Sequence, residues 1–270
     1  MAEFRRLKIG LALGSGGPKG LSHIGVIKVL EKNNIPIDFV AGTSIGSVIG
    51  GFYAATKDIK KIEEIALTNN WRQTLSLFFD PSLRQGFVDG KKIKNFIENV
   101  IGKIHFQYLK IPFSAVASDI KTGKAVILNN GDVALAIRAS SSIPLIFKPV
   151  KLENRLLVDG GLSLPVPAGV VRKMGADLVI AVNLDYDYFS NNEDNKFGVY
   201  KLANNSIRLL RYNLASLNVK DADIVINPMV GKVGWNKFID SESVILEGEK
   251  AMQSSILKLK ELIIYNIKNS

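Results

Sequence analysis

The fold of this chain is decided at residues 38–54, which read DFVAGTSIGSVIGGFYA. The run 37–42 is typical of a buried parallel strand, and the apolar run 45–56 is typical of a buried helix. Ser44 lies between them and forms the pattern G-x-S-x-G with Gly42 and Gly46. A strand, a sharp turn at a serine and a helix make up the nucleophile elbow of serine hydrolases. The spacing therefore makes Ser44 a candidate nucleophile.

A second unit of the same kind precedes this one. Residues 7–13 form a short apolar run, residues 14–20 are rich in glycine, and residues 21–33 carry apolar side chains at roughly helical spacing. Two consecutive strand–loop–helix units are typical of a parallel sheet with helices on both faces. We therefore predict an α/β fold.

The rest of the chain predicts hairpins and further helices. Hairpins are expected around the turn at 121–123 and over 147–161, and a short helix over 132–143. A helix and a strand are expected over 167–185, and longer helices near 198–218 and 242–267. Residues 59–109 read as helices and loops, with an apolar, poorly periodic insertion from 71. In the last helix one apolar stripe is expected to dock on the sheet; it consists of Met252, Ile256, Leu259, Ile263 and Ile267.

Composition limits the classes of chemistry. The 270 residues include no cysteine, which excludes a disulfide framework, a thiolate metal site and a cysteine nucleophile. The apolar runs are too short to cross a bilayer, so we expect a soluble, cytoplasmic protein. The formal net charge is +10. A basic surface attracts anionic lipid, so peripheral contact with an anionic membrane is a further expectation.

The glycine-rich loop at 14–20, GSGGPKG, does not fit the nucleotide-binding patterns. Ser15 occupies the first glycine position of G-x-G-x-x-G, and Lys19 precedes Gly20 where a P-loop has its lysine after the glycine. The loop instead suits an oxyanion hole, because glycines let backbone N–H groups turn outward at the start of a helix. A purely structural strand–helix turn is the alternative.

A serine nucleophile needs a base, and the histidines are poorly placed for this role. In α/β-hydrolases the histidine lies late in the chain, whereas here no histidine follows His105, and His23 lies within the helix after the glycine loop. The best carboxylate is Asp159, which follows an apolar strand and precedes Gly160 and Gly161. The alternative for Asp159 is an ordinary turn-forming aspartate.

Taken together, these motifs resemble the patatin-like phospholipase family, and its stand-alone bacterial members in particular. The family order is a glycine-rich loop, then G-x-S-x-G, then D-G-G. The resemblance covers about the first two-thirds of the chain, and the blocks that carry it read GLALGSGGPKGLSHIGVIKVL, DFVAGTSIGSVIGGFYA, ASDIKTGKAVILNNG, AIRASSSIPLIFKPV and LVDGGLSLPVP. It implies a three-layer α/β/α sandwich with a mainly parallel sheet. It also implies a single domain over 1–270, with the motifs at about 7–170 and a helical completion at about 198–270.

The resemblance also implies the roles of the site residues. Ser44 would be the nucleophile and Asp159 the proton acceptor of a Ser–Asp dyad, with the Gly16 and Gly17 amides as the oxyanion hole. Lys19 would add positive charge near that hole. Ser15 departs from the family, since many members have a glycine there; its amide keeps the ability to donate, while its side chain narrows the allowed backbone.

The function expected from these features is hydrolysis of lipid acyl esters, of the phospholipase A or lysophospholipase kind, through an acyl-serine intermediate. No metal, other cofactor or nucleic acid is expected to take part. Residues 71–79 are candidates for lining an acyl channel or forming a lid over it, with ordinary packing as the alternative for each residue. The alternative is a regulatory or adaptor protein that retains the fold with little turnover.

Overall fold

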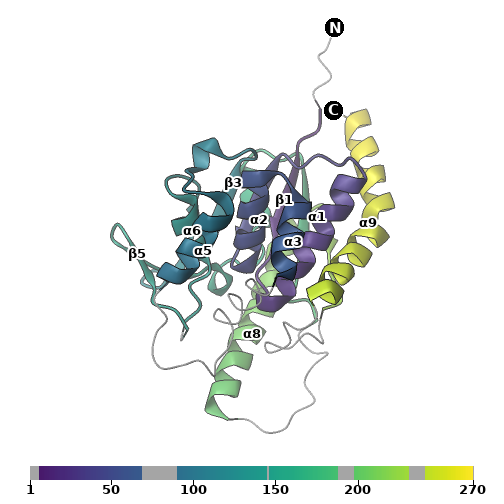
Figure 1. The fold of residues 1–270 in the computed structure, drawn as a ribbon. Helices are drawn as coiled ribbons and strands as arrows, with labels where there is room; N and C mark the ends of the chain where they lie inside the picture. The colour runs from purple at the N-terminus through teal and green to yellow at the C-terminus, as the bar shows by residue number, and fades with distance from the viewer. Residues whose placement is uncertain (1–5, 69–89, 145, 188–197, 231–240, 270) are drawn as a thin grey trace.

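The structure of the chain is a computed structural model, which describes residues 6–68, 90–144, 146–187, 198–230 and 241–269 (Figure 1). The segment 71–79 and the rest of the insertion up to 89 lie outside these residues. None of the described helices combines the length and the apolar character that a membrane span requires.

A single eight-stranded sheet forms the centre of the fold. Seven strands lie in the order β5-β6-β3-β2-β1-β7-β8, and β4 also pairs with β3. The pairs of β3, β2, β1, β7 and β8 are parallel, whereas β4, β5 and β6 run antiparallel to their neighbours. The strands are β1 (Ile9–Leu13), β2 (Phe39–Thr43), β3 (Phe113–Asp119), β4 (Ala125–Leu128), β5 (Val150–Leu152), β6 (Arg155–Asp159), β7 (Leu178–Val182) and β8 (Ile224–Ile226).

Helices cover both faces of the sheet and create two apolar cores. One face is covered by α1 (Ser22–Lys32), α2 (Ile45–Thr56), α3 (Ile59–Leu67), α5 (Lys91–Ile101), α6 (Val133–Ser140) and α9 (Ser241–Asn269), and the other by α7 (Ala168–Lys173) and α8 (Val199–Asn218). Alternate strand residues supply the two cores: Leu11 and Leu13 face the first, and Ala12 faces the second. This alternation explains why the strands are apolar on both faces. The three-layer α/β/α fold predicted from the sequence is confirmed.

The final helix α9 docks mainly on α1, with β8 as its contact on the sheet. Its predicted stripe is buried at Met252, Ile256 and Leu259. Glycines permit the close approach of the two helices: a Cβ on Gly25 would lie 2.0 Å from the Ile245 carbonyl oxygen. The sequence predicted that this helix docks on the sheet, whereas in the structure it packs mainly on α1 and contacts the sheet at β8.

The predicted hairpins are present as β3–β4 and β5–β6, and the helix–strand unit is present as α7 and β7. Strand β8 was not anticipated, because three residues are too few for a period-two pattern to stand out. Four short 3-10 segments complete the described elements: η1 (Gly17–Leu21), η3 (Phe106–Tyr108), η4 (Gly160–Leu162) and η6 (Val219–Asp221).

The strand register brings the key segments to one edge of the sheet. Thr43 of β2 pairs with Val116 of β3, and the next residue of β3, Ala117, pairs with Asp159 of β6. Ser44 follows Thr43, so it and Asp159 lie at the same level on either side of β3. Strand β6 runs away from the carboxyl end of β3 but is only five residues long, so its last residue, Asp159, still lies near the level at which β2 ends.

Candidate active site

Ser44 has an uncommon backbone conformation, with φ 56° and ψ −125°. Positive φ is costly for a residue with a side chain, and it persists only where the surroundings enforce it. The flanking glycines allow the turn: a Cβ on Gly42 would lie 2.3 Å from the Gly46 carbonyl oxygen, and a Cβ on Gly46 would lie 2.2 Å from the Leu13 carbonyl oxygen. The serine is thus presented on a sharp turn between β2 and α2, as the G-x-S-x-G pattern predicts.

A buried serine on α6 fixes this turn. The Ser44 amide donates to Ser140 Oγ at 2.9 Å, and Ser140 Oγ donates to the Val116 carbonyl at 2.6 Å. The Ser47 hydroxyl donates to the Ser44 carbonyl at 2.6 Å. Sequence reasoning missed Ser140; the signal for it was the run of three serines at 140–142, which are all buried.

The side chains of Ser44 and Asp159 meet in a direct hydrogen bond. Ser44 Oγ donates to Asp159 Oδ2 at 2.5 Å, and the two residues are only 4% and 7% exposed. The other carboxylate oxygen, Oδ1, accepts from the Gly161 amide at 2.8 Å. Asp159 is therefore also a turn-forming aspartate, which was the alternative interpretation of this residue. The turn directs Oδ2 toward Ser44.

The turn that carries Asp159 requires its glycines. A Cβ on Gly160 would lie 2.1 Å from the Val116 carbonyl oxygen, and one on Gly161 would lie 3.0 Å from Asp159 Oδ1. The Asp159 amide donates to the Ser142 carbonyl at 2.9 Å, so the same serine run that fixes Ser44 also fixes the aspartate.

Burial raises the pKa of Asp159 above the usual aspartate value, because the charged form loses its hydration. The Ser44 and Gly161 hydrogen bonds and the positive charge of Arg211 act against this rise, while the charge of Asp185 adds to it. A carboxylate with a raised pKa is a stronger base than an exposed one, which is what a proton acceptor needs.

One ion pair acts on Asp159, and a second joins the glycine loop to the segment after β7. Arg211 Nη2 of α8 lies 2.8 Å from both carboxylate oxygens of Asp185, and Lys19 Nζ lies 3.0 Å from Asp187 Oδ1. The Ser15 hydroxyl donates to Asp185 at 3.5 Å. The charge of Lys19 is thus largely offset by Asp187. No sequence pattern singled out Arg211, because its partner comes from a different part of the chain.

Two backbone amides of the glycine loop have no acceptor in the part of the chain that the structure describes. The Gly14 amide donates to Val182 and the Ser15 amide to Pro165, at 3.1 and 2.8 Å. The Ser15 amide is therefore already occupied. Within the described residues the amides of Gly16 and Gly17 have no hydrogen-bond acceptor.

The loop packs directly against the start of α2. A Cβ on Gly20 would lie 2.3 Å from the Ile45 side chain, which follows the serine. The amides of Gly16 and Gly17 thus belong to a segment held against the residue after Ser44, as an oxyanion hole requires.

Both histidines contact the scaffold of the fold rather than Ser44 or Asp159. His23 is fully buried, its Nε2 lies 2.8 Å from the Gly14 carbonyl oxygen, and burial lowers its pKa to about 4. At neutral pH the ring is neutral, with its proton on Nε2 and shared with the loop. His105 forms a backbone bridge with Asp132. Neither ring is hydrogen-bonded to Ser44 or Asp159.

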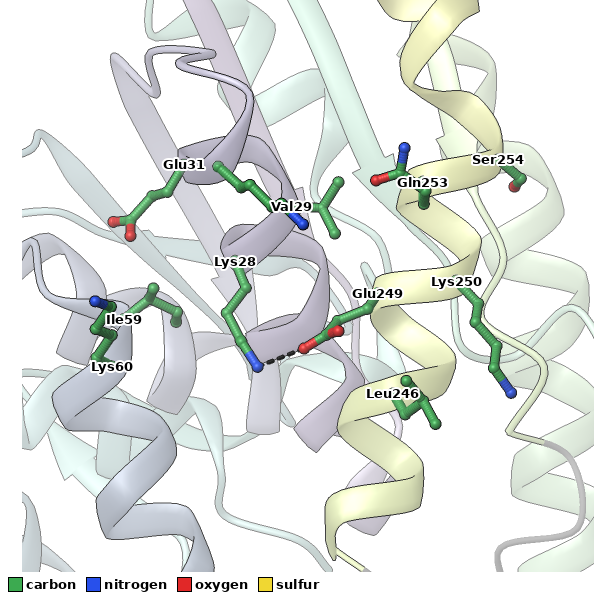
Figure 2. Close-up of a pocket in the computed structure, with 11 residues that line it drawn as sticks. Lys28, Val29, Glu31, Ile59, Lys60, Leu246, Glu249, Lys250, Gln253 and Ser254 are labelled. Carbon is green, nitrogen blue, oxygen red and sulfur yellow. Dashed lines mark ion pairs between the residues drawn. The ribbon is translucent and has the colours of Figure 1, made fainter.

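A large pocket of about 970 Å³ lies elsewhere, between α1, α3 and α9 (Figure 2). Val29, Ile59 and Leu246 contribute its apolar lining. Lys28 forms ion pairs with Glu249 and with Glu63, the latter at 2.7 Å. None of the dyad or glycine-loop residues lines this groove. Among the described side chains no three His, Asp or Glu residues form a cluster that could hold a metal ion.

Known proteins resemble this chain in sequence and in fold. The model of the family described as patatin-like phospholipase matches residues 11–172, more than half of the chain. An uncharacterised NTE family protein of Mycobacterium tuberculosis is 38% identical over 184 residues, which cover 66% of this chain and 49% of that protein. The lysophospholipase NTE1 of Yarrowia lipolytica is 34% identical over 182 residues, which cover 65% of this chain and 12% of that protein.

The chain thus spans about half the length of the mycobacterial relatives and a small part of the fungal one. Among solved structures, the type III effector protein ExoU of Pseudomonas aeruginosa superposes with a TM-score of 0.51 at 11% identity, covering 94% of this chain and 53% of that chain. At this identity the likeness concerns the fold alone.

Proposed function

Because this chain belongs to the patatin-like phospholipase family, we propose that it is a lipid acyl hydrolase that works through a Ser44–Asp159 dyad. One observation carries the proposal: a serine on a strained turn donates a 2.5 Å hydrogen bond to a buried carboxylate, with no imidazole between them. Its substrates would be phospholipids or lysophospholipids, the class that the names of the family and of a relative indicate.

In the first half of the reaction Ser44 Oγ attacks the acyl carbonyl carbon, and its proton passes to Asp159 Oδ2. The carbonyl oxygen becomes negative in the tetrahedral intermediate, where the Gly16 and Gly17 amides donate hydrogen bonds to it. The intermediate collapses, the ester bond breaks, and the leaving alcohol takes the proton from Asp159. The product at this stage is an acyl-Ser44 ester.

In the second half a water molecule gives its proton to Asp159 and attacks the acyl-Ser44 carbonyl. Collapse of the second intermediate releases the fatty acid and returns the proton to Ser44 Oγ. Asp159 thus accepts and gives back one proton in each half, which a single well-placed carboxylate can do without a third residue.

The test compares two buried serines in one assay. Ser44→Ala is expected to abolish hydrolysis of p-nitrophenyl butyrate and labelling by a fluorophosphonate probe. Ser114→Ala removes another buried hydroxyl, which contacts Met174 rather than the dyad, and should leave both unchanged. Equal background rates for wild type and Ser44→Ala would reject the hydrolase and favour the adaptor alternative.

A further inference from the structure

Among the side chains of helix α8 that the structure describes, the exposed ones form a continuous face that carries no charge. Among the residues of this helix whose side chains the structure describes, the exposed ones recur every three or four positions and so lie on one side. They are Leu202, Ala203, Ser206, Leu209, Leu210, Asn213, Ser216 and Leu217. Three of the four leucines are more than half exposed: Leu202 at 56%, Leu210 at 63% and Leu217 at 58%. We call this set the leucine face.

The opposite side of α8 lies against the edge of the sheet where Ser44 and Asp159 meet, which we call the catalytic edge. Ala215 is buried in the second core, and Arg211 reaches Asp185 beside the dyad. The helix also packs on η4, the turn that follows Asp159. Figure 1 shows α8 at the bottom of the molecule, at the end where α1 and α9 begin and away from both chain termini. The leucine face is therefore the outer surface of the element that borders the site.

Helix α9 shows that an exposed helix face of this protein is ordinarily charged. Its exposed positions include Leu246, Leu257, Ile264 and Tyr265, with Leu257 at 74%, but exposed charged residues lie among them along the helix. These are Glu242, Lys250, Lys258, Lys260 and Glu261. An exposed leucine amid charges is common on soluble surfaces, whereas four leucines on an uncharged face indicate a surface that contacts something apolar.

We propose that the leucine face of α8 is the surface by which this protein rests on a lipid bilayer. The choice of a bilayer as the partner rests on the proposed function, because a lipid acyl hydrolase takes its substrate from such a surface. An uncharged leucine face with small polar residues between the leucines suits the boundary between headgroups and acyl chains. Lys220 is exposed just beyond the helix, and the net charge of +10 attracts the whole molecule to anionic lipid.

This docking sets the distance between membrane and dyad. With the leucine face in the headgroup layer, the Asp159 turn lies about one helix diameter, ~10 Å, from the lipid surface. A lipid drawn partly out of the leaflet then presents its ester at the edge of the sheet where Ser44 lies.

The experiment uses the full chain and measures binding and chemistry separately. Flotation with vesicles of phosphatidylcholine and phosphatidylglycerol, at low and at high salt, compares wild type with the double variant Leu210→Gln and Leu217→Gln. Leu257→Gln on α9 is the matched control, because it removes an equally exposed leucine from a charged face. Hydrolysis of p-nitrophenyl butyrate, a substrate dissolved in water, reports whether the dyad is intact.

The double variant is expected to bind vesicles about tenfold more weakly at high salt, where charge attraction is screened and leucine burial dominates. It should keep the wild-type rate on the soluble ester, and Leu257→Gln should match wild type in both assays.

If wild type does not float with vesicles, or the double variant floats equally well, the proposal is wrong. It is also wrong if sedimentation shows a wild-type dimer that the double variant converts to monomer, since a second copy then covers the face. Failure of the proposed function is detected separately. If Ser44→Ala still hydrolyses the soluble ester at the wild-type rate, the proposed dyad is wrong, but the flotation result is unaffected.

Discussion

The catalytic edge and the groove between α1, α3 and α9 differ in how their polar groups are arranged. The groove is large, but its central lysine, Lys28, is paired with two glutamates on regular helices. At the catalytic edge a serine has a strained backbone, a buried carboxylate contacts its hydroxyl, and two amides lack acceptors within the described residues. The comparison indicates that backbone amides without acceptors and a strained backbone are better signs of a reactive site than the volume of a pocket.

The sharpest test of the comparison is Asp159→Asn. The amide cannot accept the serine proton, so the rate on p-nitrophenyl butyrate should fall by about 10³-fold or more. Folding should be unharmed, because the folded state holds Asp159 at a raised pKa and the charged form costs stability at neutral pH. Thermal melting at pH 7 should therefore give an equal or higher midpoint. A variant with near-normal turnover would mean that another group takes the proton.

A smaller effect is expected from Ser140→Ala, which removes the acceptor for the Ser44 amide. Without this hydrogen bond the strained turn relaxes and the nucleophile moves from its attacking position. We expect kcat on the soluble ester to fall by about tenfold to a hundredfold with little change in KM. Fluorophosphonate labelling should slow in parallel, while Ser114→Ala remains normal. Normal kinetics for Ser140→Ala would show that the flanking glycines and the Ser47 hydrogen bond are enough to hold the turn.

The pH dependence of the rate tests the charges around the dyad. Activity requires ionised Asp159, so the rate rises as pH increases through its raised pKa. Arg211 lowers this pKa, and its removal also leaves Asp185 unpaired, which raises the pKa further. Arg211→Met should therefore shift the acidic limb to higher pH. Arg172→Met, which breaks a surface pair with Asp223, is the control and should leave the profile in place.

The groove should give the smallest response. Lys28→Met breaks two partly exposed ion pairs, and such pairs contribute about 1 kcal/mol or less to the free energy of unfolding. Urea unfolding should show a loss of this size or none, and ester hydrolysis should keep the wild-type rate. A large loss of activity with intact stability would place the groove in the reaction and break the comparison.

The sequence predicted what depends on local pattern. Short apolar runs followed by glycines located β1 and β2, and G-x-S-x-G located the strained turn at Ser44. Ser44 and Asp159 are 115 positions apart in the sequence, and their meeting was predicted because each partner carries its own local signal and the family order links them. Ser140 and Arg211 had no such signal, since their roles exist only through the register of β3 with its neighbours and the placement of α8.

The leucine face is another feature that the sequence alone did not reveal. A helix at 198–218 was predicted, but the side it buries is decided by Ala215 and Arg211 against the catalytic edge, which spacing alone does not reveal. The insertion at 71–79 lies outside the described residues, so its proposed contact with the acyl chain stays a prediction.

His23 has a consequence for the acid tolerance of the protein. Its ring is neutral and pinned to the Gly14 carbonyl, with a pKa of about 4 instead of about 6.5 in an unfolded chain. Between these two values the unfolded chain takes up a proton that the folded chain refuses, so the free energy of unfolding falls as the solution is acidified through this interval. The imidazole, though it lies outside the proposed dyad, thereby lowers the stability of the folded chain on acidification, and the acid limit of the protein is set partly by its scaffold.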